Sequence, residues 1–156
     1  MSDPGSAPYV AALRLLGRRE LSEAQIRVRL VRRGYDEADI DHAITRLKSD
    51  RSLDDARVAG AIARTEVALK LRGRRRVRRQ IEAAGIAPDL AARAVEETFA
   101  EVDEDALLTR AFEKARRGRT RATDERERGR LYRLLLGQGF EADRVLALLR
   151  KPHRLE

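Results

Sequence analysis

Apolar residues recur along this chain at helical spacing, and one arrangement of them occurs three times. Two apolar residues four positions apart precede a glycine; an apolar residue follows it directly, and two more follow six and ten positions after it. The three copies are Ile26, Leu30, Gly34, Tyr35, Ile40 and Ile44; Val77, Ile81, Gly85, Ile86, Ala91 and Val95; and Leu131, Leu135, Gly139, Phe140, Val145 and Leu149. Because residues four apart share one helical face, each copy predicts two amphipathic helices that meet at a glycine.

The residues around these helices predict where they begin and end. Each of the three glycines is expected to end a helix in the left-handed conformation, and the apolar residue after it to fold back onto the last turn. Ser22 and Gln25 have the spacing of a capping box for the helix of the first copy. Asp36 is expected to cap the next helix, and Pro88 to lie in the first turn of the corresponding helix of the second copy.

A longer helix is predicted before each copy, at about 8–17, 54–71 and 104–117. We therefore expect an all-α fold of three tandem three-helix repeats that form an elongated molecule, straight or curved. The expected divisions are a disordered segment 1–8, repeats at 9–50, 51–102 and 103–151, and a tail at 152–156. The alternative is that glycine-terminated amphipathic helices look alike in any all-helical protein.

Composition narrows the class of protein. The 156 residues include 42% hydrophobic but only 4% aromatic residues, which predicts a thin aliphatic core typical of small helical modules. The absence of cysteine excludes disulfides and thiolate metal sites and fits a reducing cytoplasm. No apolar run is long enough for a membrane span, and the first residues do not resemble a secretory signal.

No group of residues predicts catalysis. His42 and His153 are far apart and lack metal-ligand spacing, and His42 is expected to be an exposed helical residue. The adjacent Asp54 and Asp55 point about 100° apart on a helix, so helix capping is the better interpretation than a shared acid–base site. We expect no enzyme, no metal and no cofactor.

Basic residues are concentrated in two segments, although the whole chain carries a formal charge of only +8. Between positions 64 and 80, only Glu66 opposes a set that we call the basic ridge: Arg64, Lys70, Arg72, Arg74, Arg75, Arg76, Arg78 and Arg79. A second basic stretch contains Arg116, Arg117, Arg119 and Arg121, and the segment between the two, 89–105, is acidic. Arginine pairs with phosphate or carboxylate through two donors, so a polyanion is the expected partner; the alternative is a solvated charged face.

The helical register predicts how the basic ridge is presented. Val77 and Ile81 set the buried direction, which turns Arg75 and Arg79 outward and leaves the neighbouring arginines on the flanks. Such contacts with phosphates would be independent of sequence, and aromatic residues for stacking on bases are few.

The chain also resembles a known family over about residues 9–150. The run Leu53-Asp54-Asp55-Ala56-Arg57, the arginine-rich stretch, and Arg76-Val77-Arg78-Arg79-Gln80-Ile81 ending at Gly85-Ile86 are similar to the central signature of the RecX regulatory proteins. Further similar stretches are Ala12-Leu13-Arg14-Leu15-Leu16 near the start and Leu134-Leu135-Leu136 with Gly139-Phe140 near the end. This chain departs from the family pattern at Val58, Ile62 and Glu66.

The resemblance implies a bacterial cytoplasmic protein of DNA recombination, DNA repair and the SOS response. It implies a monomer that binds the filament of the RecA recombinase on single- or double-stranded DNA and usually inhibits RecA ATPase and strand exchange. The basic ridge, the second basic stretch and the motif of Leu53, Asp54, Asp55 and Arg57 are then the candidate binding residues. The alternative, based on charge alone, is a general sequence-independent module for DNA or structured RNA.

Overall fold

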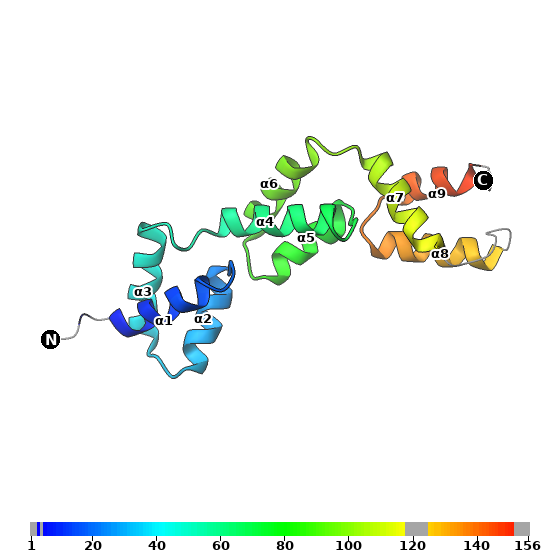
Figure 1. Cartoon of the computed structure of the whole chain (residues 1–156). Coiled ribbons are helices and arrows are strands. Elements are labelled where there is room, and N and C mark those ends of the chain that lie inside the picture. The colour runs from blue at the N-terminus through cyan, green and yellow to red at the C-terminus, as the bar shows by residue number, and fades with distance from the viewer. Residues whose placement is uncertain (1–2, 4, 118–124, 152–156) are drawn as a thin grey trace. The chain divides into compact units, whose positions relative to one another are not determined.

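The computed structural model describes residue 3, residues 5–117 and residues 125–151, and within them the chain folds into nine α-helices and no strand (Figure 1). The prediction of an all-α fold is confirmed. The helices are α1 (Ser6–Leu16), α2 (Glu23–Arg32), α3 (Glu37–Ser49), α4 (Asp55–Ala68), α5 (Arg74–Ala83), α6 (Pro88–Phe99), α7 (Glu104–Arg116), α8 (Glu125–Gly137) and α9 (Ala142–Arg150).

The helices pack into two compact units. The first unit contains the chain up to Ala61 together with Ile81–Ala94, and the second contains Ile62–Gln80 together with the chain from Val95 onward. Each unit therefore combines one end of the chain with residues from α4, α5 and α6. The division into three repeats remains a prediction about the sequence pattern.

The three glycines of the repeated pattern end helices as predicted. Gly34, Gly85 and Gly139 have φ angles of 85°, 80° and 96°, in the left-handed region that favours glycine. After Gly34, the Tyr35 N–H donates to the Leu30 carbonyl at 3.3 Å, and this pairing occurs again between Phe140 and Leu135 at 3.3 Å. These are the hydrogen bonds of a Schellman motif, so the same local chemistry ends α2 and α8.

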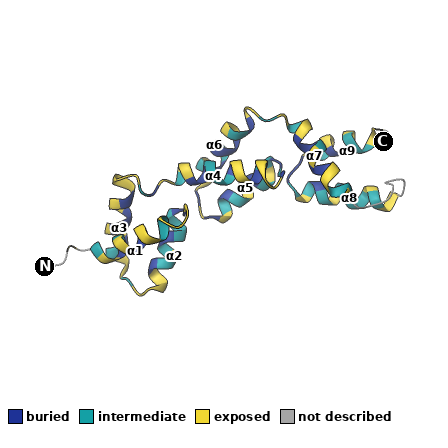
Figure 2. Cartoon of the chain, viewed as in Figure 1, coloured by how far each residue is buried: buried dark blue, intermediate teal, exposed yellow. Residues whose placement is uncertain are grey.

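The apolar positions of the pattern supply the core, as the buried stripes of the helices in Figure 2 show. Around α1, α2 and α3 the buried cluster includes Ile26, Leu30, Ile40 and Ile44, and the half-buried Tyr35 packs against it. The equivalent residues of the second copy are buried as well. In the third copy Leu149 is only partly buried, which is expected for a residue in the last turn of the last helix.

The starts of α1 and α3 differ in detail from the expectations. Helix α1 begins at Ser6, so part of the segment expected to be disordered is helical; Pro8 is tolerated because N–H groups of the first turn have no helical partner. Asp36 is the N-cap residue of α3, but its side chain makes no capping hydrogen bond. Asp36 is exposed, so its carboxylate loses little by staying hydrated.

Ser22 begins α2 as predicted and also ties α2 to a distant part of the chain. Its Oγ accepts from the Gln25 N–H at 3.2 Å, and the Gln25 side chain accepts from the Ser22 N–H at 3.1 Å, which is the expected capping box. The same hydroxyl is fully buried and donates to the Ala84 carbonyl at 2.5 Å. A Cβ on Gly85 would collide with the Cβ of Ala24, so the glycine turn after α5 packs closely against the start of α2.

Candidate functional site

All eight residues of the basic ridge lie in the second unit. Arg64 is on the second half of α4, Lys70 and Arg72 follow that helix, and the five remaining arginines lie in the first two turns of α5. Arg64, Arg75, Arg78 and Arg79 are exposed, and for Arg75 and Arg79 this is what the register of Val77 and Ile81 predicts. The flanking Arg76 is half-buried.

The start of α5 rests directly on the turn between α8 and α9. The Gly73 N–H donates to the Gln138 carbonyl at 2.9 Å, and the Arg75 N–H donates to the Gly139 carbonyl at 3.3 Å. A Cβ on Gly73 would lie 2.5 Å from the Gly139 oxygen, and one on Gly139 would collide with the backbone nitrogen of Arg76. Two glycines thus allow backbone to pack on backbone, and this contact fixes the helix that carries most of the ridge.

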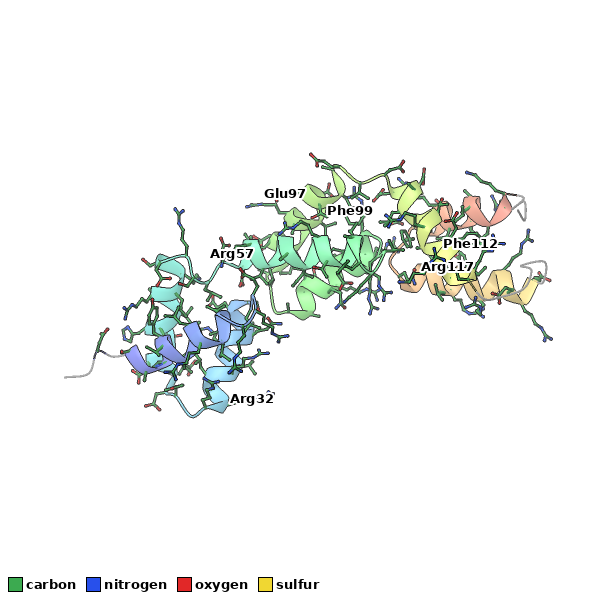
Figure 3. The ribbon with its side chains drawn as sticks, viewed as in Figure 1. Arg32, Arg57, Glu97, Phe99, Phe112 and Arg117 are labelled. Carbon is green, nitrogen blue, oxygen red and sulfur yellow. The ribbon has the colours of Figure 1, made fainter. Side chains whose placement is uncertain are left out.

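Part of the basic ridge is already paired with the chain's own carboxylates. Arg74 forms ion pairs with Glu104 and with Glu96, whose Oε1 lies 2.8 Å from the Arg74 Nη1. Its guanidinium carbon also lies 5.0 Å from the centre of the Phe99 ring. Some of the acidic segment 89–105 therefore folds against the ridge. Glu97, also on α6, is exposed and its side chain points away from the ribbon (Figure 3).

Two further members of the ridge have internal partners. Arg75 holds both oxygens of Glu141 through its Nε and Nη2, each at 3.0 Å. Lys70 lies 2.6 Å from Glu66, whose side chain is buried. Glu66 is one of the positions that depart from the family pattern, and the buried carboxylate is neutralised by this neighbour one turn away.

The remaining cations are the ones best placed to meet an outside anion. Among the described residues, Arg64 and Arg79 are exposed and make no ion pair or side-chain hydrogen bond. Arg72 and Arg76 are half-buried, and the Nε of each is enclosed without an acceptor. The available charge of the ridge is therefore centred on Arg64 and Arg79 rather than spread evenly over eight residues.

The second basic stretch is only partly within the described residues. Arg116 ends α7 with its guanidinium carbon 5.1 Å from the centre of the Phe112 ring, and the exposed Arg117 is the C-cap residue. Cations at this position also stabilise the negative end of the helix dipole. The predicted binding residues Arg119 and Arg121 lie outside the described residues.

The four residues of the family motif have structural roles in the first unit. Leu53 is buried, and Asp54 caps α4 by accepting from the Arg57 N–H at 3.1 Å. Asp55 accepts from the Glu23 N–H at 2.8 Å, at the first residue of α2. The motif therefore joins two helix starts, in agreement with the capping interpretation of the adjacent carboxylates.

Arg57 completes this joint. At the N-terminal end of α4 (Figure 3), its Nε donates to Glu20 at 2.9 Å, and its terminal nitrogens donate to the carbonyls of Arg51 and Ser52 at 3.1 and 3.2 Å. Arg51 has a φ of 61°, which is unusual for a residue other than glycine. Arg57 thus holds a turn that the sequence alone does not favour, and we infer that the motif positions helices rather than contacting a partner.

The partly buried carboxyl of Asp55 should make the stability of the protein depend on pH. Burial raises the pKa of its carboxyl above the ordinary 3.8, against the lowering effect of the Glu23 N–H. The folded chain then holds this proton more tightly than the unfolded chain, so the stabilisation is complete below the unfolded pKa and is lost as pH rises through the folded pKa. Asp55→Asn keeps an oxygen for the Glu23 N–H but cannot titrate. We expect urea unfolding to show wild type losing stability relative to Asp55→Asn as pH rises above the ordinary carboxyl pKa of 3.8; a difference that stays constant with pH would contradict this.

Nothing in the described residues indicates catalysis. His42 is exposed on α3, as predicted, and His153 lies outside the described residues. Within residues 5–117 and 125–151 there is no cluster of histidine or acidic residues that could hold a metal ion. None of the helices described above has the length and apolarity to cross a membrane.

The sequence reasoning missed Glu141, and it named Glu66 without the ion pair that Glu66 forms with Lys70. Glu141 lies 66 positions from Arg75, and no local pattern connects them. For Glu66, the spacing of four residues to Lys70 on a helix was an available signal.

Comparison with known proteins places these features in context. Residues 9–47 match the family described as RecX, first three-helix domain. The regulatory protein RecX of Vibrio parahaemolyticus is 32% identical over 137 residues, covering 86% of this chain and 84% of that protein. The one from Halorhodospira halophila is 33% identical over 151 residues, covering 94% and 91%. The relative in Geobacillus kaustophilus is 31% identical over 154 residues, but this chain spans only 55% of its length.

Two solved structures share the fold. The crystal structure of RecX from Lactobacillus salivarius superposes with a TM-score of 0.82 at 19% identity, covering 96% of this chain and 97% of that one. A crystal structure of a regulatory protein RecX gives a TM-score of 0.81 at 23% identity, covering 95% and 73%. At these identities the likeness concerns the fold.

Proposed function

Because this chain belongs to the RecX family of regulatory proteins, we propose that it regulates DNA recombination and repair by binding the RecA–DNA filament. The observation that supports this proposal is the exposed charge of Arg64 and Arg79 on the second unit, which has no ion-pair partner among the described residues. Exposed arginines without a carboxylate partner can exchange counterions for phosphates, whatever the DNA sequence.

The contact between Gly73 and Gly139 adds to this argument. Because it fixes the start of α5, the arginines of that helix are presented from a rigid base, and less entropy is lost when they meet a partner. We further propose that the chain acts as a cytoplasmic monomer, without catalytic activity or a cofactor, and that it binds filaments on single- and double-stranded DNA.

The proposal is tested by the effect of purified protein on RecA. Inhibition is the expected sign: at saturating concentration the protein lowers the rate of DNA-dependent ATP hydrolysis by RecA and shortens the lifetime of the filament. If both quantities stay at their values without added protein, the proposal is wrong.

A second candidate function is a general nucleic-acid module for DNA or structured RNA. The arginine-rich composition of the ridge favours it equally, since phosphate contacts alone do not distinguish a filament from naked nucleic acid. It predicts an affinity for naked DNA or RNA that matches or exceeds the affinity for RecA filaments at the same salt concentration.

Removing Glu141, the internal partner of Arg75, is expected to strengthen DNA binding. Glu141→Ala removes the carboxylate that holds Arg75 and leaves this exposed guanidinium for a phosphate. We expect tighter binding to single-stranded DNA and a salt dependence steeper by about 0.7 in the log–log slope. Fluorescence anisotropy across a salt series measures both quantities.

Asp143→Ala is the matched control, because Asp143 lies in the first turn of α9, which begins directly after the N-cap residue Glu141, and has no ion pair within the described residues. Both variants change the net charge equally. An equal gain in the two variants would mean that total charge, and not release of Arg75, determines the effect.

A further inference from the structure

A notch of about 330 Å³ opens in the second unit between the end of α4 and the helices α7 and α8. We call it the α4–α7 notch. Its lining includes Leu69, Arg72, Ala111, Lys114, Ala115 and Leu134. It is lined by residues distinct from Arg64 and Arg79, on which the proposed phosphate contacts depend.

The notch has an apolar floor next to an exposed leucine. Ala111 and Ala115 are one turn apart on α7, and their small side chains leave room that Leu134 of α8 borders. Leu69 stands at the opening with 73% of its surface exposed, the largest exposure among the exposed large hydrophobic residues of the described chain. An exposed leucine beside a hollow apolar floor is typical of a site that takes an apolar side chain.

The backbone holds Leu69 in this place. Leu71 has a φ of 53°, a left-handed conformation that costs a residue other than glycine roughly 1–2 kcal/mol. The Leu71 N–H donates to the Val67 carbonyl at 3.2 Å and the Arg72 N–H to the Glu66 carbonyl at 3.0 Å. This strained and hydrogen-bonded turn buries Leu71 and leaves Leu69 outside, so the exposure of Leu69 is built into the fold.

The charge around the notch has one sign. None of the described residues that line it is a carboxylate, and one of its two lysines, Lys70, is neutralised by Glu66. Within the described residues, Lys114 is exposed and Arg72 is half-buried, and neither makes an ion pair. The opening therefore complements a group that carries negative charge close to an apolar side chain.

We propose that the α4–α7 notch docks an acidic peptide segment of a protein partner, with one apolar side chain on the Ala111–Ala115 floor and carboxylates beside Lys114 and Arg72. Nucleic acid fits less well, because single strands bind on aromatic side chains and none of the described lining residues is aromatic. The docking site does not depend on the proposed function, since peptide binding can be measured without RecA or DNA.

The probe is a fluorescein-labelled peptide, Asp-Glu-Leu-Phe-Glu-Asp. The control is the same peptide with serine in place of the two apolar residues. Anisotropy with the full chain is expected to show binding of the apolar peptide about tenfold tighter than the serine peptide. Lys114→Glu reverses the charge at the opening, and Ala115→Leu fills the floor of the notch. Each should weaken binding about tenfold. Lys151→Glu and Ala147→Leu make the same changes at exposed positions outside the notch and should leave it unchanged.

A second measurement uses only the wild-type chain. In a two-dimensional amide NMR titration, the apolar peptide should shift the resonances of Leu69 and of residues 111–115 and leave those of α1–α3 in place. Equal binding of both peptides, or shifts confined to other residues, would overturn the proposal. So would a labelled oligothymidylate whose binding falls as much as peptide binding in Ala115→Leu, because the notch would then belong to the nucleic-acid surface.

Discussion

Gly139→Ala is expected to lower the free energy of unfolding of the second unit by about 2–5 kcal/mol. Two costs add at this position. The φ of 96° is unfavourable for alanine, and the new Cβ would collide with the backbone nitrogen and the Cβ of Arg76. Backbone atoms of a helix start cannot move aside as a flexible side chain can, so the strain spreads into the joint that fixes α5. Urea unfolding followed by far-UV circular dichroism measures the loss.

Gly34→Ala is the matched control, because Gly34 occupies the same position in the repeated pattern. Its φ of 85° is equally unfavourable for alanine, but no atom lies within 4 Å of the added Cβ. Only the conformational cost of about 1–2 kcal/mol should remain. If the two variants lose equal stability, the close contact between Gly139 and the start of α5 is not part of the folded protein in solution.

Removing Arg64 and Arg79 together is expected to have the largest effect on binding. Arg64→Ala with Arg79→Ala deletes the two exposed cations of the basic ridge that have no partner within the described residues. If each contacts one phosphate, the log–log salt slope for single-stranded DNA falls by about 1.4, and affinity at low salt falls by roughly tenfold or more. Stability should change little, because neither side chain supports the fold.

The control for this pair is Arg32→Ala with Arg33→Ala, at the end of α2, where Figure 3 labels Arg32. Both residues are exposed, and the change in net charge is the same. Their removal should lower affinity only through the general charge of the protein and should leave the slope nearly unchanged. Equal losses in both pairs would show that the ridge is not a specific contact surface.

Local chemistry explains why much of the fold was predictable from the sequence. The glycine that ends α2 or α8, the capping box at Ser22 and the first-turn Pro88 depend on residues a few positions apart, whose spacing is visible in the chain. Val77 and Ile81 likewise determine which arginines of α5 face outward, since helical register needs no knowledge of distant contacts.

The candidate site was harder to predict because its electrostatics depend on distant partners. Arg75 appeared outward and available, and it is exposed, yet Glu141 from the turn before α9 holds both of its donors. The carboxylates at Asp54 and Asp55 suggested caps, but that Asp55 caps α2 rather than its own helix follows only from the packing of the first unit. Gly73 belongs to none of the three copies of the repeated pattern, and its need for close approach emerges only beside Gly139.

Co-sedimentation with RecA filaments on single-stranded DNA, run across a salt series beside naked DNA, tests the central claim most directly. We predict that the wild-type chain pellets with the filament at low salt and binds it more tightly than it binds naked DNA. The bound fraction should fall as salt rises, and it should fall at lower salt for Arg64→Ala with Arg79→Ala. A chain that stays in the supernatant at low salt, or prefers naked DNA, would contradict filament binding through the arginines of the second unit.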